Sequence, residues 1–145
     1  MRAVGLLSPG DMGHTVAQVL MGRGMPVLTN LSGRSDRTRT LARSVGIEDV
    51  LSYGELVRRT DLILSIVAPA EARNVAQNVA RALEKTGAET TFVDCNAVSP
   101  ATAEKIAETI GDAGGRFDRR ATAPRGRDYQ ILRIWPARQS ICRLG

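Results

Sequence analysis

Short apolar runs alternate along this chain with segments of helical period, from the N-terminus to about residue 117. The run at residues 3–7 is continuously apolar and ends at Ser8-Pro9-Gly10, which is typical of a buried central strand. Residues 11–23 then place apolar side chains on one helical face, and Gly24 follows as a stop signal. This alternation indicates repeated βα units around a parallel sheet.

The same pattern continues along the chain. Further strands are expected at residues 25–31, 50–52, 61–67 and 90–95. Further helices are expected at residues 35–45, 55–59, 72–83 and from Ser99 up to Gly114. Two apolar faces are clear, Val16, Ala17, Val19 and Leu20 in the first helix and Ala72, Val75, Ala76, Val79, Ala80 and Leu83 in the fourth. The order predicts an α/β fold, a Rossmann-type doubly wound parallel sheet that is incomplete at its C-terminal end.

Composition places the chain among soluble globular proteins of one domain, with 43% hydrophobic and 24% charged residues. No apolar run reaches the roughly 20 residues of a membrane helix, and the N-terminus lacks the features of a secretory signal. We therefore expect a cytoplasmic protein with no membrane contact. Cys95, Cys142 and His14 are too few and too far apart for a disulfide framework or a metal site, so no metal is expected.

The net charge of +5 lies entirely in residues 118–145, which hold seven arginines and two aspartates. Residues 1–117 carry 13 basic and 13 acidic side chains, so the body of the protein is electrically balanced. No nucleic-acid partner is therefore expected, because a basic face belonging to the folded part would be needed for it.

The segment Ser8-Pro9-Gly10-Asp11-Met12-Gly13 has the spacing of a dinucleotide-binding glycine loop, with Ser8 in place of the first glycine. A purely structural turn between a strand and a helix uses glycine in the same way. The position of the segment favours cofactor binding, because it would direct backbone N–H groups and the positive end of a helix at a phosphate.

Three segments together resemble the 6-phosphogluconate dehydrogenase and β-hydroxyacid dehydrogenase superfamily, which includes 3-hydroxyisobutyrate dehydrogenase. They are Gly5–Gly13, Val67-Ala68-Pro69 and Val93–Pro100 (VDCNAVSP), and the resemblance spans about residues 1–117. It implies that Ser8, Pro9, Gly10, Asp11, Met12 and Gly13 hold the pyrophosphate of a nicotinamide dinucleotide. It also implies that Val67, Ala68 and Pro69 lie on the adenine side and Asn96 on the nicotinamide side. The chain departs from the family at Ser8 and at Asn96-Ala97, where the family has a Ser-Thr pair.

The choice of cofactor depends on the end of the second strand, where a carboxylate would bind the ribose 2′-hydroxyl and repel a 2′-phosphate. Residues 29–35 read Thr-Asn-Leu-Ser-Gly-Arg-Ser and contain no carboxylate. Arg34 and Ser35, with Arg37 nearby, offer the cation and hydroxyl that a phosphate requires. These residues predict NADP as the cofactor. NAD stays open as the alternative, because Asp36 can compete for a hydroxyl and a basic turn before a helix cap has the same sequence.

The resemblance also implies that a helical domain carrying the catalytic lysine and most substrate contacts follows in the family. We expect it to be absent here, so no catalytic residue is assigned and the chain alone is expected to be inactive. Codons compatible with residues 127–136 encode Gly-Thr-Thr-Lys-Phe-Tyr-Ala-Ser-Gly-Pro one nucleotide later, which resembles the family's sixth-strand region. Residues 118–145 are therefore interpreted as an irregular arginine-rich tail, either a disordered basic segment or the product of a frame shift. Oligomerisation is expected only with the helical domain. The alternative to a cofactor-binding domain of a dehydrogenase is a non-enzymatic protein, either a truncated product or a nucleotide-binding partner module.

Overall fold

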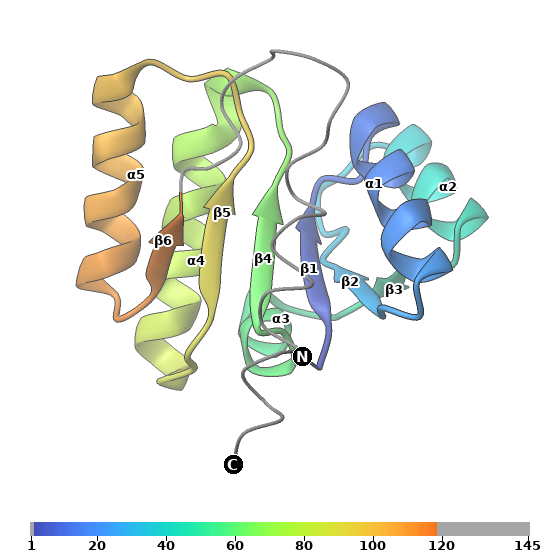
Figure 1. Ribbon diagram of the computed structural model, residues 1–145, viewed down its shortest axis with the longest axis horizontal. Coiled ribbons are helices and arrows are strands. Elements are labelled where there is room, and N and C mark those ends of the chain that lie inside the picture. Colours follow the sequence, from blue (N-terminus) through green and yellow to red (C-terminus); the bar gives the residue numbers. More distant parts are fainter. Residues whose placement is uncertain (1, 119–145) are drawn as a thin grey trace.

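The computed structural model describes residues 2–118. They form one six-stranded sheet, parallel throughout, in the order β3-β2-β1-β4-β5-β6 (Figure 1). The strands are β1 (Val4–Leu7), β2 (Val27–Thr29), β3 (Glu48–Asp49), β4 (Leu62–Ser65), β5 (Thr91–Asp94) and β6 (Arg116–Asp118). The helices are α1 (Asp11–Gly22), α2 (Asp36–Ser44), α3 (Tyr53–Arg59), α4 (Ala72–Thr86) and α5 (Pro100–Asp112), with a 3₁₀ turn η1 (Pro69–Glu71). The predicted doubly wound α/β fold is confirmed.

Two apolar cores lie on the two faces of the sheet (Figure 1). One core joins α3, α4 and α5 to inward residues of the strands such as Leu7, Ile63 and Phe92. The other joins α1 and α2 to Leu6, Leu64 and others. Successive strand residues belong to opposite cores, as the two-residue period of a strand requires. All six residues of the predicted stripe on α4 are buried.

The predicted apolar face of the first helix is wrong at Val19, which is 40% exposed. The buried residues of α1 are Gly13 and Ala17. They are four positions apart and share one face, whereas Val19 is two positions further round the helix. The small residue Ala17 is thus the fully buried part of this face, and Val16, Leu20 and Met21 pack half-buried against the same core.

The predicted strand at residues 50–52 is also wrong, because β3 consists of the preceding Glu48 and Asp49. Val50 makes one last backbone bond, from its N–H to Thr29 O at 2.8 Å, and Ser52 then caps α3. Val50 is buried, but Leu51 is 91% exposed. Val50 and Leu51 thus belong to the turn that follows β3.

The sequence pattern did not predict β6. Its Phe117 ring stacks on Phe92 of β5, with ring centroids 6.3 Å apart. Gly115 lets the chain pass from α5 to the sheet, since a Cβ there would lie 2.8 Å from both Ile110 Cγ2 and Leu83 Cδ1. β6 extends one residue past the predicted boundary at 117, and the arginine-rich tail with its reading-frame interpretation lies outside the described residues. No helix within residues 2–118 is long and apolar enough to cross a membrane.

Candidate functional site

The loop Ser8–Gly13 leaves the carboxyl end of β1 and starts α1 (Figure 1). Ser8 has a φ of +55°, a left-handed conformation that favours glycine, so it stands where the fingerprint's first glycine is expected. The N–H of Gly10 then donates to Ser8 O at 2.7 Å, which closes the turn. Gly10 is the N-cap of α1, and no side chain caps this end. The first N–H groups of α1 are therefore left for another acceptor.

The two glycines of this loop have different reasons to be glycine. A Cβ on Gly13 would lie 3.3 Å from Ser8 O and 3.6 Å from Leu6 Cδ2, so close packing of helix on strand disfavours a side chain there. Among residues 2–118, a Cβ on Gly10 would meet only Ser8 O, at 4.0 Å. Protein packing thus accounts for Gly13, while the open space over Gly10 fits a ligand that approaches the backbone.

The exposed Asp11 at the start of α1 is paired with Arg37 of α2, whose Nη2 lies 2.8 Å from Asp11 Oδ1. The hydrogen bond from Arg37, followed by its positive charge, lowers the pKa of Asp11 below its ordinary value. The carboxylate charge at the predicted phosphate loop is thereby balanced. Arg37, predicted to lie near a phosphate, is held by this carboxylate.

A cleft of about 430 Å³ opens between the β2–α2 connection, the start of α3 and the start of α4. Its lining residues are Asn30, Ser32, Gly33, Arg34, Leu51, Ser52, Tyr53, Glu71, Asn74, Val75 and Asn78. Arg34, which the sequence associated with a phosphate, lies in the lining of this cleft. Ser35 is not part of the lining, and its Oγ accepts from Thr38 N as the cap of α2.

The sequence reasoning missed two carboxylates near the end of β2. Glu71 of η1 accepts from Arg34 Nη1 at 2.9 Å, across the cleft. Asp49 of β3 accepts from Leu31 N at 2.9 Å. Both come from other elements, so a search of the residues that follow β2 could not find them.

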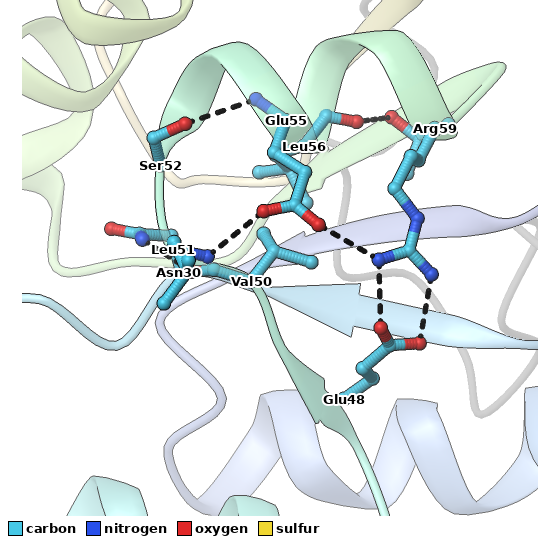
Figure 2. A network of polar contacts seen from close by, with 9 residues as sticks. Asn30, Glu48, Val50, Leu51, Ser52, Glu55, Leu56 and Arg59 are labelled. Atoms are coloured by element: carbon cyan, nitrogen blue, oxygen red, sulfur yellow. Dashed lines mark hydrogen bonds and ion pairs between the residues drawn. The ribbon is translucent and has the colours of Figure 1, made fainter.

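A polar network fixes the wall of the cleft formed by Leu51 and Ser52 (Figure 2). Arg59 donates to Glu48 and to Glu55 at 2.7 and 3.0 Å, and Glu55 in turn accepts from Leu51 N. The hydrogen bond to Glu48 makes the largest contribution in raising the pKa of Arg59 above its ordinary value. The turn after β3 is thus tied to α3 at several points.

A buried polar cluster joins the carboxyl ends of β4 and β5. Asn96, 3% exposed, accepts from Val67 N at 2.7 Å through Oδ1 and donates from Nδ2 to Ser65 Oγ and Asp94 Oδ1 at 3.0 and 2.7 Å. The predicted nicotinamide-side residue therefore has its amide engaged within the protein. Asn96 brings together two segments that the sequence selected separately, Val67–Pro69 and the segment after β5.

Other predicted site residues differ in burial. Val67 is half-buried against the α4 core, while Ala68 and Pro69 are exposed at η1. Met12, in the first turn of α1, is 62% exposed. Burial, and then the charge of Asp94, raises the pKa of the Cys95 thiol to about 12, so this thiol is protonated at neutral pH and is a poor nucleophile.

Asn96→Ala should lower the free energy of unfolding by about 1–3 kcal/mol, because it removes the acceptor of the Val67 N–H and the buried amide donor to Ser65 Oγ and Asp94 Oδ1. Urea unfolding measures the change. The matched control is Asn74→Ala at an exposed position of α4, which we expect to change stability by no more than about 0.5 kcal/mol. Equal effects of the two substitutions would contradict a stabilising role for the cluster.

Known proteins share this fold and part of this sequence. A Methanothermus fervidus protein, described as an uncharacterized 28.5 kDa protein in the 7S RNA 5′ region, is 29% identical over 109 residues. The match covers 75% of this chain and 41% of that protein. The conserved protein MTH1747, of unknown function and with reported structural similarity to 3-hydroxyacid dehydrogenases, is 30% identical with a TM-score of 0.69. That match covers 79% of this chain and 41% of MTH1747.

A more distant structure, the 3-hydroxyisobutyrate dehydrogenase of Mycobacterium tuberculosis with L-serine, has the same fold at 21% identity and a TM-score of 0.65. The match covers 81% of this chain and 39% of that enzyme. This chain thus spans about two fifths of the length of these relatives. The family model for the NAD binding domain of 6-phosphogluconate dehydrogenase matches residues 3–118, nearly the whole described part. The chain therefore belongs to the family of this NAD binding domain, as its sequence resemblance predicted.

Proposed function

We propose that this chain is the NADP-binding domain of a β-hydroxyacid dehydrogenase-like oxidoreductase. The observation that carries the proposal is the open space over Gly10, at the uncapped N-terminus of α1. Backbone N–H groups and the positive end of the helix meet there, and no side chain of residues 2–118 lies within 4 Å of the place that a Cβ on Gly10 would take. A pyrophosphate on Ser8–Gly13 satisfies those groups.

The other contacts are proposed around this anchor. The adenine side of the cofactor lies along Val67, Ala68 and Pro69, and the nicotinamide side lies toward Asn96. The amide of Asn96 is engaged with Val67 N and Asp94, so we propose that it shapes this end of the site through the loop that it holds. When bound, the nicotinamide supplies hydride transfer, and the protein supplies orientation.

The proposed preference for NADP rests on Arg34. Its guanidinium lines the cleft, and the neighbouring positions Asn30 and Leu31 carry no carboxylate that would bind a ribose hydroxyl in place of a phosphate. Ser35 stands next to it, with its hydroxyl at the start of α2. A guanidinium is well suited to a phosphate because it offers several donors in one plane.

NADPH should bind more tightly than NADH, and Arg34→Ala should remove most of that difference. A charge-assisted hydrogen bond contributes about 1.5–3 kcal/mol, so we expect NADPH affinity to fall roughly tenfold to a hundredfold. NADH affinity should change less than about twofold, since it lacks the 2′-phosphate. Fluorescence titration of both cofactors measures this. Arg43→Ala, at the exposed end of α2, is the control for net charge. An unchanged preference for NADPH in Arg34→Ala would contradict the assignment of Arg34 to the 2′-phosphate.

Gly10→Val should weaken both cofactors, because it places a side chain in the space reserved for the pyrophosphate. An overpacking cost of about 1–3 kcal/mol predicts a roughly fivefold to hundredfold loss for NADPH and for NADH alike. The free energy of unfolding should fall by no more than about 1 kcal/mol, since valine only replaces a better N-cap residue. Gly22→Val, at the exposed far end of α1, should leave both affinities unchanged. Normal binding by Gly10→Val would show that the phosphates lie elsewhere.

We further propose that the 145-residue chain binds cofactor without oxidising hydroxy acids. The acid–base groups near the site are engaged within residues 2–118: Asp94 accepts from Asn96, Asp11 is paired with Arg37, and the Cys95 thiol is protonated. Oxidation also requires that the substrate carbon be held against the nicotinamide, and we assign no residue of this chain to that task. Absorbance assays of NADPH formation with a panel of β-hydroxy acids should give no rate above the enzyme-free control. Measurable turnover by the purified chain would refute this proposal and leave the binding proposal intact.

A further inference from the structure

We infer that Glu71 is a specificity-determining residue that competes with the 2′-phosphate of the cofactor for Arg34. This inference rests on the proposed cofactor site. It adds to the lack of a carboxylate at the end of β2 a second influence on cofactor choice, which comes from a carboxylate on the other side of the cleft. Glu71 lies 37 residues after Arg34 in the sequence, yet its Oε2 is 2.9 Å from Arg34 Nη1.

The position of Arg34 is fixed by its own backbone. Its N–H donates to Leu31 O at 3.1 Å, which closes a turn whose third residue, Gly33, has a φ of +71°. Its carbonyl accepts from Arg39 Nε at 3.2 Å. The Arg34 side chain is only 17% exposed. The guanidinium is therefore held in the cleft, and an anion that takes its Nη1 donors has to compete with Glu71 for them.

Glu71 is free to leave more easily than Arg34. Its side chain is 52% exposed, and it extends from the three-residue turn η1. Glu71 is also the N-cap residue of α4, but its carboxylate makes no capping bond to that helix. The carboxylate is thus turned to Arg34 rather than to the N–H groups of its own helix. We conclude that the ion pair occupies the guanidinium while the cleft holds no other anion.

NADPH and NADH differ in the charge that they would bring to the Arg34–Glu71 ion pair. The 2′-phosphate of NADPH carries close to two negative charges, which would lie beside the carboxylate and would take donors from the guanidinium. The ribose hydroxyls of NADH are neutral and leave the ion pair intact. Glu71 therefore opposes NADPH selectively, and the strength of the preference is set by both residues.

The Arg37–Asp11 pair is different in kind. Its side chains are 74% and 73% exposed, and it lies at the start of α1 rather than in the lining of the cleft. Solvent and salt screen such a pair strongly. It also faces the predicted pyrophosphate, which both cofactors share, so it does not discriminate between them.

The test is a titration of the full chain with NADPH and with NADH, in wild type, Glu71→Gln, Arg34→Met and the double variant. Glutamine keeps the shape of Glu71 and removes its charge. We expect Glu71→Gln to tighten NADPH roughly threefold to tenfold, with NADH changed less than about twofold. The gain should shrink as salt is raised, since part of the repulsion is screened. In the Arg34→Met background the gain from Glu71→Gln should be smaller.

The control is Glu84→Gln, which removes the same charge about 20 Å further along α4. It should leave both affinities unchanged. The inference is overturned if Glu71→Gln leaves the ratio of the two affinities unchanged, shifts both cofactors equally, or weakens NADPH. The last result would mean that Glu71 positions Arg34 for the phosphate. Failure of the proposed function looks different, because then neither cofactor binds any variant or Arg34→Met leaves NADPH binding unaltered.

Discussion

Burial of one parallel sheet on both faces is the constraint on which the rest of this structure depends. Parallel strands need crossover connections, and the apolar residues on each face need helices to cover them. The chain satisfies both needs by running outward from β1 in two directions, with α1 and α2 on one face and α3, α4 and α5 on the other. The loops after β1 and β4 therefore lead from the carboxyl edge of the sheet to helices on opposite faces, the kind of position at which folds of this type bind ligands.

The polar groups at that edge are organised before any ligand arrives. The buried amide of Asn96 ties the loop after β4 to the end of β5, and Asp94 accepts from both its backbone and its side chain. Such a cluster is stable only when its members satisfy one another, because a buried polar group without a partner costs about 1–3 kcal/mol. Its effect is to fix the position of the Val67–Pro69 segment. In this way a structural network shapes a binding edge.

Charge at the site follows a common rule. Arg34 and Arg37, the two arginines that the sequence associated with phosphate, are each held by a carboxylate from another element, Glu71 and Asp11 respectively. Pairing keeps this part of the free protein close to neutral, and in the proposed site a phosphate would have to exchange with a carboxylate. The proposed selectivity then depends on how firmly Glu71 is held, which is a property of the fold rather than of the loop that carries Arg34.

The sequence by itself determined the class of fold, the family and most of the elements. Continuous apolar strands, the α4 stripe and the caps Ser35 and Ser99 are local signals, so they can be read without coordinates. The tertiary structure decided what depends on distant residues. Three residues of mixed polarity became β6 because Phe117 stacks on Phe92, and Val50 ended a strand rather than forming one. Asp49 of β3 and Glu71 of η1, the turn after β4, reached the end of β2, since parallel strands bring their carboxyl ends to one edge whatever their separation in sequence.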